Sequence, residues 1–318
     1  MALEKLVEIK NLYTHFHTEN GVVKAVDDVS FEIYKGETLG LVGESGCGKS
    51  VTSLSIMGLV PHPGRVSGEI YFKGKNLVGL SDKEMMHYRG HKIAMIFQEP
   101  MTSLNPVFTI GDQITEPLIQ HKKMDKKSAY KKAIELLKLT RIPNPEKVIK
   151  DYPHTLSGGM RQRAMIAMML SCDPDLLIAD EPTTALDVTV QKQILKLMND
   201  LKKEVNASVL LITHDLGVVA EVTDRVAVMY AGKIVEYGDK IPIFENPQHP
   251  YTRGLLDALP QAGKEELKTI RGEVPNLKYL PSGCSFHPRC DYCIDKCKKE
   301  MPGLEGEKHK VRCWSPLK

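Results

Sequence analysis

Residues 43–50 read Gly-Glu-Ser-Gly-Cys-Gly-Lys-Ser, and this stretch decides the fold of the 318-residue chain. It fills every fixed position of the G-x-x-x-x-G-K-[ST] pattern of a phosphate-binding loop. The apolar run 38–42 before it is typical of a buried strand, and residues 50–57 after it have helical spacing. Such a loop turns successive backbone N–H groups toward an anion at the positive end of a helix. The sequence therefore predicts that a nucleoside triphosphate binds here.

Individual residues of this loop have distinct expected roles. Lys49 is expected to reach the β- and γ-phosphates, and Ser50 to offer its hydroxyl to Mg²⁺. Cys47, between two glycines, is interpreted as a small residue that fills space beside the nucleotide. The further residues predicted to contact the nucleotide are Gly43, Ser45, Gly46, Gly48 and Val51.

Composition narrows the class of protein. A hydrophobic share of 42% and a charged share of 26% are typical of a folded, soluble chain. The net charge of +3 is small and spread along the sequence, which argues against a dedicated nucleic-acid binder. No apolar run approaches the roughly 18–20 residues of a membrane span, and residues 1–8 do not resemble a signal peptide. We therefore expect a cytoplasmic protein that other chains hold at any membrane it serves.

Apolar runs alternate with helical patterns along the chain and predict a mainly parallel α/β sheet. The expected strands are residues 3–12, 22–35, 69–76, 92–98, 176–180 and 208–213, with two short strands about residues 231–233. The expected helices cover much of 110–150 and residues 189–204. Pro242, Pro247, Pro250 and Pro260 then mark a change to linker-like composition.

Two further motifs carry chemistry. Residues 156–163 place Ser157 and two glycines at a helix start, which predicts either a second anion site or an ordinary helix cap. The strand 176–180 ends in two carboxylates, of which Asp180 suits Mg²⁺ and Glu181 suits polarisation of an attacking water. A plain pair of helix-capping acids is the alternative interpretation of these two residues.

Over residues 1 to about 235 the order of these motifs resembles the nucleotide-binding subunit of an ABC transporter. Residues 43–50 match the Walker A loop, Gln98 the Q-loop, and 156–160 the signature motif. Asp180 and Glu181 match the Walker B pair, residues 185–187 the D-loop, and His214 the switch histidine. Phe16 best fits the aromatic that stacks on adenine, with Tyr13 as the fallback and a core-facing aromatic as the alternative.

The resemblance implies a mechanism. Lys49 holds the phosphates of ATP, Glu181 is the general base, and His214 steadies the γ-phosphate. Ser50, Gln98 and Asp180 position Mg²⁺, while Ser157 and Gly159 contact ATP held by a second subunit. One chain has one Walker A loop and one signature motif, so two ATPase subunits must enclose two ATP molecules between them.

The implied fold is a P-loop ABC ATPase of the α/β class, with a mixed or parallel sheet core, an antiparallel β subdomain and a helical subdomain. We predict an ATPase domain at 1–240, with its helical subdomain at about 100–170, and a linker or helical extension at 241–283. A small cysteine-rich extension would occupy 284–318.

Residues 246–260 and 272–290 closely resemble the tail of one ABC subgroup, the dipeptide/oligopeptide importer ATPases. The implied partners are a second ABC ATPase subunit, most naturally a different chain, two transmembrane permeases and, indirectly, an extracytoplasmic peptide-binding protein. The implied location is the cytoplasmic face of the cell membrane. Importers of another solute such as nickel share parts of this tail, and soluble ABC ATPases of DNA repair or translation form a rival class.

Five of the seven cysteines crowd the last 35 residues, a pattern that in a cytosolic chain favours metal ligation over disulfides. The subgroup's pattern implies a [4Fe–4S] cluster on Cys284, Cys290, Cys297 and Cys313, with Cys293 as a possible substitute ligand. Four cysteines serve Zn²⁺ equally well, so the spacing leaves both metals open. A nucleic-acid-binding zinc module is disfavoured, because Tyr292 and Trp314 are the only Trp or Tyr residues in 284–318.

Overall fold

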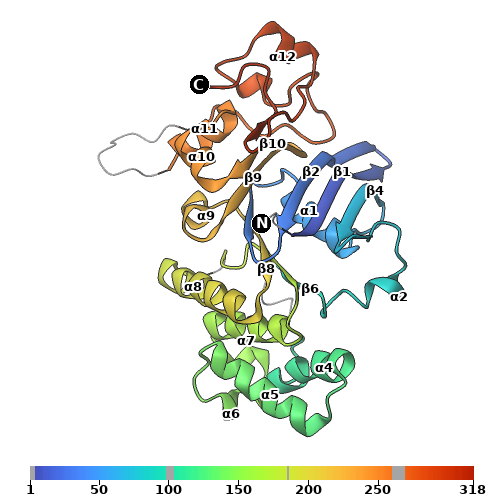
Figure 1. The fold of residues 1–318 in the computed structure, drawn as a ribbon, viewed down its shortest axis with the longest axis vertical. Helices are drawn as coiled ribbons and strands as arrows, with labels where there is room; N and C mark the ends of the chain where they lie inside the picture. Colours follow the sequence, from blue (N-terminus) through green and yellow to red (C-terminus); the bar gives the residue numbers. More distant parts are fainter. Residues whose placement is uncertain (1–3, 98–103, 185, 260–268) are drawn as a thin grey trace. The chain divides into compact units, whose positions relative to one another are not determined.

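The computed structural model describes residues 4–97, 104–184, 186–259 and 269–318, and Figure 1 shows the path of the chain. Two compact units make up the structure. Unit 1 comprises Met1–Gly79 with Leu211–Lys318, and unit 2 comprises Leu80–Leu210. The chain leaves unit 1 after Gly79 and returns to it at Leu211, inside strand β8 (Ser208–Thr213).

Unit 1 contains an antiparallel sheet in the order β2-β1-β4-β5. Its strands are β1 (Lys5–Thr18), β2 (Gly21–Tyr34), β4 (Gly64–Phe72) and β5 (Lys75–Asn76). One face of each long strand is apolar, and alternate residues such as Ile9, Phe31 and Ile33 are buried. On β1, the Thr14 hydroxyl lies 2.7 Å from the Ser55 hydroxyl of helix α1 (Lys49–Met57), which places this face of the sheet against that helix.

A second set of strands in unit 1 carries the phosphate-binding loop. β3 (Thr38–Val42) pairs in parallel with β9 (Arg225–Tyr230), and β9 pairs antiparallel with β10 (Lys233–Asp239). All five residues of β3 are buried, as expected of a strand with neighbours on both faces. Outside the cysteine-rich tail, the described helices of this unit are α1, α9 (Leu216–Val222), α10 (Lys240–Glu245) and α11 (Pro250–Asp257).

The cysteine-rich tail is a short, loop-rich segment within unit 1. It contains the 3₁₀ turn η2 (His287–Arg289), α12 (Asp295–Lys299) and β11 (Lys310–Val311), and β11 extends the sheet by pairing with β10. Arg312 is 6% exposed and donates to the Ile234 carbonyl at 2.9 Å and to the Asp28 carboxylate at 3.1 Å. Buried arginine contacts of this kind anchor a segment that has little apolar core of its own.

Unit 2 is largely helical. β6 (Ile93–Ile96) pairs in parallel with β7 (Leu176–Asp180). The helices in its described residues are α2 (Asp82–Met85), α4 (Ile110–Lys122), α5 (Lys126–Leu139), α6 (Pro145–Val148), α7 (Gly158–Leu170) and α8 (Val188–Val205), with a 3₁₀ turn η1 (Pro153–Thr155). A core of apolar side chains from α4, α5 and α7 holds this unit together, with Ile114, Leu137 and Ala164 almost fully buried.

Most expected elements are confirmed. The strands predicted at 22–35, 176–180 and 208–213 and the helix predicted at 189–204 agree with β2, β7, β8 and α8 within one residue. The first strand was predicted to end at residue 12, and this end is wrong, because β1 continues to Thr18 and forms a hairpin with β2. The expected parallel arrangement holds for β3 with β9 and for β6 with β7, while β10 and β11 add antiparallel strands.

None of the helices in the described part of the chain combines the length and hydrophobicity that a bilayer span requires.

Substitution of Leu137 by Ala tests the core of unit 2. Leu137 is fully buried, so Leu137→Ala is expected to cost about 2–5 kcal/mol of stability through lost burial and the cavity left behind. Leu139, two residues along on the same helix, is 42% exposed and provides the matched control. Thermal unfolding should show a clearly lower midpoint for Leu137→Ala than for Leu139→Ala. Equal midpoints would contradict this description of the core.

Candidate active site

The phosphate-binding loop joins β3 to α1 and depends on three glycines with positive φ. Gly43, Gly46 and Gly48 have φ of 153°, 77° and 106°. A Cβ on Gly43 would lie 2.1 Å from the Met229 carbonyl oxygen, and a Cβ on Gly48 would lie 2.1 Å from that of Ala25. Glycine is therefore required at these two positions by space as well as by backbone conformation.

The side chain of Lys49 lies inside the loop that precedes it. Its Nζ donates to the carbonyl oxygens of Gly43 at 2.8 Å and Glu44 at 3.0 Å, and the residue is only 5% exposed. Ser45 and Gly46 form the exposed tip, while Ser50 and Val51 are half-buried in the first turn of α1. α1 begins at Lys49, and its N-cap Gly48 makes no side-chain hydrogen bond, so the start of the helix presents backbone donors.

Cys47 belongs to the interior of this loop. It is fully buried, and burial raises the pKa of its thiol. The Cys47 carbonyl accepts from the Gly232 N–H at 2.9 Å, just beyond the end of β9. Its interpretation as a small packing residue fits this environment.

The two candidate adenine-stacking aromatics lie on opposite faces of β1. Phe16 and Thr14 are two residues apart on β1 and share a face, and Thr14 contacts α1. Tyr13 points to the other face, where burial and the carboxylates of Asp28 and Asp27 raise the pKa of its phenol. Phe16 lies half-buried opposite Gly64. Its assignment as the adenine-stacking aromatic stays a prediction.

His214 lies directly after β8 and is exposed. The next residue, Asp215, caps α9 by accepting from the N–H groups of Gly217 at 2.8 Å and Val218 at 3.2 Å. This cap ends the strand sharply and fixes the backbone on which the histidine stands.

The carboxylate pair lies at the end of β7 in unit 2. Asp180 is the last residue of the strand and is 4% exposed. Glu181 has φ of 45°, a left-handed conformation that costs a non-glycine residue about 1–3 kcal/mol and is concentrated at functional sites. The Thr184 hydroxyl donates to Glu181 Oε2 at 2.9 Å, which orients the carboxylate.

The serine of the signature motif caps a long helix. Ser157 is exposed and accepts from the Met160 N–H at 3.3 Å at the start of α7, which confirms the expected cap. Gly159 approaches α8, since a Cβ there would lie 3.2 Å from Val190. Asp187, from the D-loop motif, caps α8 in the same manner. Gln98 and Ala185 lie outside the described residues.

Sequence reasoning missed residues that connect these motifs. Gln162 on α7 is fully buried and donates to the Pro182 carbonyl at 2.5 Å, which links the signature helix to the turn after Glu181. Arg289 and Tyr251 contact Glu44 of the phosphate-binding loop. A polar residue at an apolar position of α7 was the only sequence signal for Gln162, and the other two contacts had none.

The tail cysteines are brought into one neighbourhood. Burial, and then the nearby Cys297 and Cys313, raise the pKa of the Cys284 thiol to about 11. Burial also raises the pKa of Cys290 to about 12, with Cys313 and Cys284 among its neighbours. The predicted metal centre is not confirmed, because no group of three or more His, Cys, Asp or Glu side chains in the described ranges is arranged to hold a metal ion.

These features define a P-loop ATPase of the ATP-binding cassette class. They are a strand, a glycine-rich loop and a helix that starts with Lys-Ser, together with a carboxylate pair after a buried strand and a Ser-capped signature helix. Comparison with known proteins shows that the chain belongs to the ABC transporter family. The family described as "ABC transporter" matches residues 26–184, and the one described as "Oligopeptide/dipeptide transporter, C-terminal region" matches residues 235–297. The chain is therefore an ATP-hydrolysing enzyme.

Similar proteins match over nearly the whole length. The dipeptide transport ATP-binding protein DppD of Bacillus subtilis is 54% identical, over 98% of this chain and 95% of that protein. The oligopeptide transport ATP-binding protein AppD of the same organism is 53% identical, over 98% and 97%. Among solved structures, a dimeric post-hydrolysis state of the ATP-binding cassette MJ0796 with ADP and Pi is 29% identical, with a TM-score of 0.66 over 73% of this chain and 98% of that one.

Replacement of Gly48 by Ala tests the close packing of the loop. The new Cβ would collide with the Ala25 carbonyl, so Gly48→Ala is expected to abolish measurable ATP binding. Gly46→Ala is the matched control, because Gly46 also has positive φ but nothing lies within 4 Å of its Cβ position. The left-handed conformation alone costs about 1–2 kcal/mol, so this control should keep part of its affinity. Equilibrium titration with Mg-ATP measures both, and equal losses would contradict the packing argument.

Proposed function

We propose that the chain is the nucleotide-binding subunit that powers an ABC importer of dipeptides or oligopeptides. The observation that carries this proposal is identity above 50% along the full length with ATP-binding proteins of dipeptide and oligopeptide transport, including the C-terminal region. A soluble ABC ATPase is disfavoured by that C-terminal match. An importer of another small solute, such as nickel, is the remaining alternative.

The proposed chemistry is ATP hydrolysis by water. Lys49 and the loop N–H groups hold the phosphates, and Ser50 and Asp180 position Mg²⁺, with Gln98 as a further ligand. Glu181 takes a proton from the attacking water, and His214 hydrogen-bonds the γ-phosphate. The support is local: Lys49 is held inside the loop, Asp180 is buried at a strand end, and Thr184 orients the Glu181 carboxylate.

The proposed active unit is a pair of ATPase subunits. Each chain carries one phosphate-binding loop and one Ser157 motif, and Ser157 with Gly159 would complete the site of the other subunit. Support comes from the similar cassette solved as a dimer. We further propose that the second ATPase is a different chain, that two permeases bind the pair at the cytoplasmic face of the membrane, and that a peptide-binding protein acts indirectly.

The division of the chain into domains at 1–240, 241–283 and 284–318 remains a prediction.

Replacement of Glu181 by Gln tests the general base. The amide cannot accept the proton, so Glu181→Gln is expected to retain ATP binding while hydrolysis falls by about 10²–10⁴-fold. Phosphate release and equilibrium ATP titration measure the two effects separately. Glu204→Gln, an exposed position near the end of α8, is the matched control and should leave both unchanged. Near-normal hydrolysis by Glu181→Gln would overturn the assignment.

We also propose a thiolate metal centre, a [4Fe–4S] cluster, on Cys284, Cys290, Cys297 and Cys313. Support comes from the mutual proximity of these thiols, because Cys297 and Cys313 act on Cys284, and Cys313 and Cys284 act on Cys290. Burial and these neighbours raise the pKa of both thiols, so the thiolates that a metal needs are costly without a cation beside them. A bound cation would offset that cost and tie the loop-rich tail together. Cys293 is proposed only as a substitute ligand, and its thiol donates to the Ile294 carbonyl at 3.6 Å.

Anaerobic purification tests the metal. The expected protein is brown, absorbs near about 400 nm and carries about four iron atoms per chain. Cys290→Ser should lose the colour, and Cys293→Ser, the matched control, should keep it. A colourless preparation with about one zinc per chain would replace the cluster with a zinc site, and a metal-free one would end the proposal.

A further inference from the structure

Glu44, the second residue of the phosphate-binding loop, is hydrogen-bonded by residues from the C-terminal part of the chain. Arg289 donates through both terminal nitrogens to the Glu44 carboxylate, at 2.8 Å and 3.0 Å. The Glu44 N–H donates to the Tyr251 hydroxyl at 2.9 Å. Backbone and side chain of one loop residue are thus both held by residues that follow it by more than 200 positions, and all three residues lie in unit 1.

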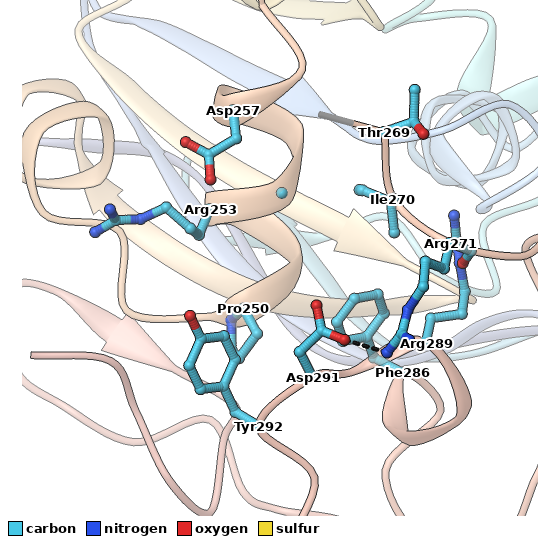
Figure 2. Close-up of a pocket in the computed structure, with 11 residues that line it drawn as sticks. Pro250, Arg253, Asp257, Thr269, Ile270, Arg271, Phe286, Arg289, Asp291 and Tyr292 are labelled. Atoms are coloured by element: carbon cyan, nitrogen blue, oxygen red, sulfur yellow. Dashed lines mark hydrogen bonds and ion pairs between the residues drawn. The ribbon is translucent and has the colours of Figure 1, made fainter. Parts of the chain in front are cut away.

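Arg289 is itself rigidly held. It is 7% exposed, its Nε donates to the Arg271 carbonyl at 2.8 Å, and its guanidinium lies 5.7 Å from the Tyr230 ring and 6.0 Å from the Phe286 ring. Tyr230, Tyr251 and Phe286 contact one another with ring centroids 4.6–5.4 Å apart. Figure 2 shows Arg289 next to Phe286 in the wall of a cavity of about 300 Å³, opposite Arg253. A planar guanidinium fixed this way binds a carboxylate with defined geometry.

The contacts of Arg289 and Tyr251 with Glu44 affect the groups of the loop that would bind ATP. The Glu44 carboxylate is negatively charged, like the triphosphate that the loop would bind, so the two repel each other. Arg289 neutralises this carboxylate through two hydrogen bonds. The Glu44 carbonyl is also one of the two that hold the Lys49 ammonium. The positions of Glu44 and Lys49 are therefore linked, and Arg289 adds a constraint from the segment that ends at Cys290.

We propose that Arg289 and Tyr251 are positioning residues of the phosphate-binding loop, through which the C-terminal tail sets the affinity for ATP. This inference rests on the ATP site of the proposed function and adds control of that site by the tail. Because coupling between two sites is reciprocal, ATP in turn stabilises the tail.

The test is a double-mutant cycle on the purified full-length chain, with Mg-ATP affinity measured by equilibrium titration. Arg289→Gln is expected to weaken ATP binding by roughly tenfold, within the usual range of coupling between sites. In a Glu44→Gln background, where the carboxylate is already neutral, the same change should cost less than about twofold. Arg271→Gln is the matched control, since its side chain forms an exposed ion pair with Asp291 and the substitution keeps the backbone carbonyl that accepts from Arg289.

The stoichiometry of binding separates positioning from damage. A positioning role raises the dissociation constant while every chain still binds one ATP, whereas partial unfolding lowers the number of binding chains. If Arg289→Gln proves unstable, Tyr251→Phe serves as the second variant. It removes a single hydroxyl and should weaken ATP binding while every chain still binds one ATP. Affinity within twofold of the wild type for Arg289→Gln or for Tyr251→Phe, or additive effects in the cycle, would overturn the inference. A wild-type chain that binds no ATP would instead overturn the proposed function.

Discussion

The ammonium of Lys49 lies against the carbonyls of its own loop, and the phosphate site depends on that geometry. The loop can curl around Nζ only because Gly43 and Gly48 allow the backbone to pass against carbonyls of Met229 and Ala25. Those two residues belong to β9 and β2, so the loop is packed between strands that are distant in sequence. A motif of eight residues therefore requires the surrounding unit before it becomes a binding site.

The local parts of the site were predictable from the sequence, because local patterns determine them. A fully apolar run of five residues predicts β3, and a serine before two glycines predicts the cap of α7. Glu44 and Arg289 were different: 245 residues separate them, and neither occupies a patterned position. Pairing at such a distance is a property of the folded sheet and its packing, so composition and periodicity carry no signal for it.

Strain and support occur together at the carboxylate pair. Glu181 adopts a backbone conformation that is unfavourable for a residue with a side chain, and it is held there by the Thr184 hydroxyl and by the turn that Gln162 binds through Pro182. A cost of this kind persists only where surrounding contacts determine the conformation. The buried amide of Gln162 also joins the signature helix to that turn through its hydrogen bond with the Pro182 carbonyl.

The Arg289–Glu44 contact also orders events during synthesis. A ribosome builds the chain from its N-terminus, and contacts between residues far apart in sequence form late in folding. The phosphate-binding loop is among the first segments made, yet the arginine that neutralises its carboxylate is added 245 residues later. The nucleotide site thus reaches its final electrostatic form only when the tail has been made and has docked, so a prematurely ended chain would carry the whole motif without its completed environment.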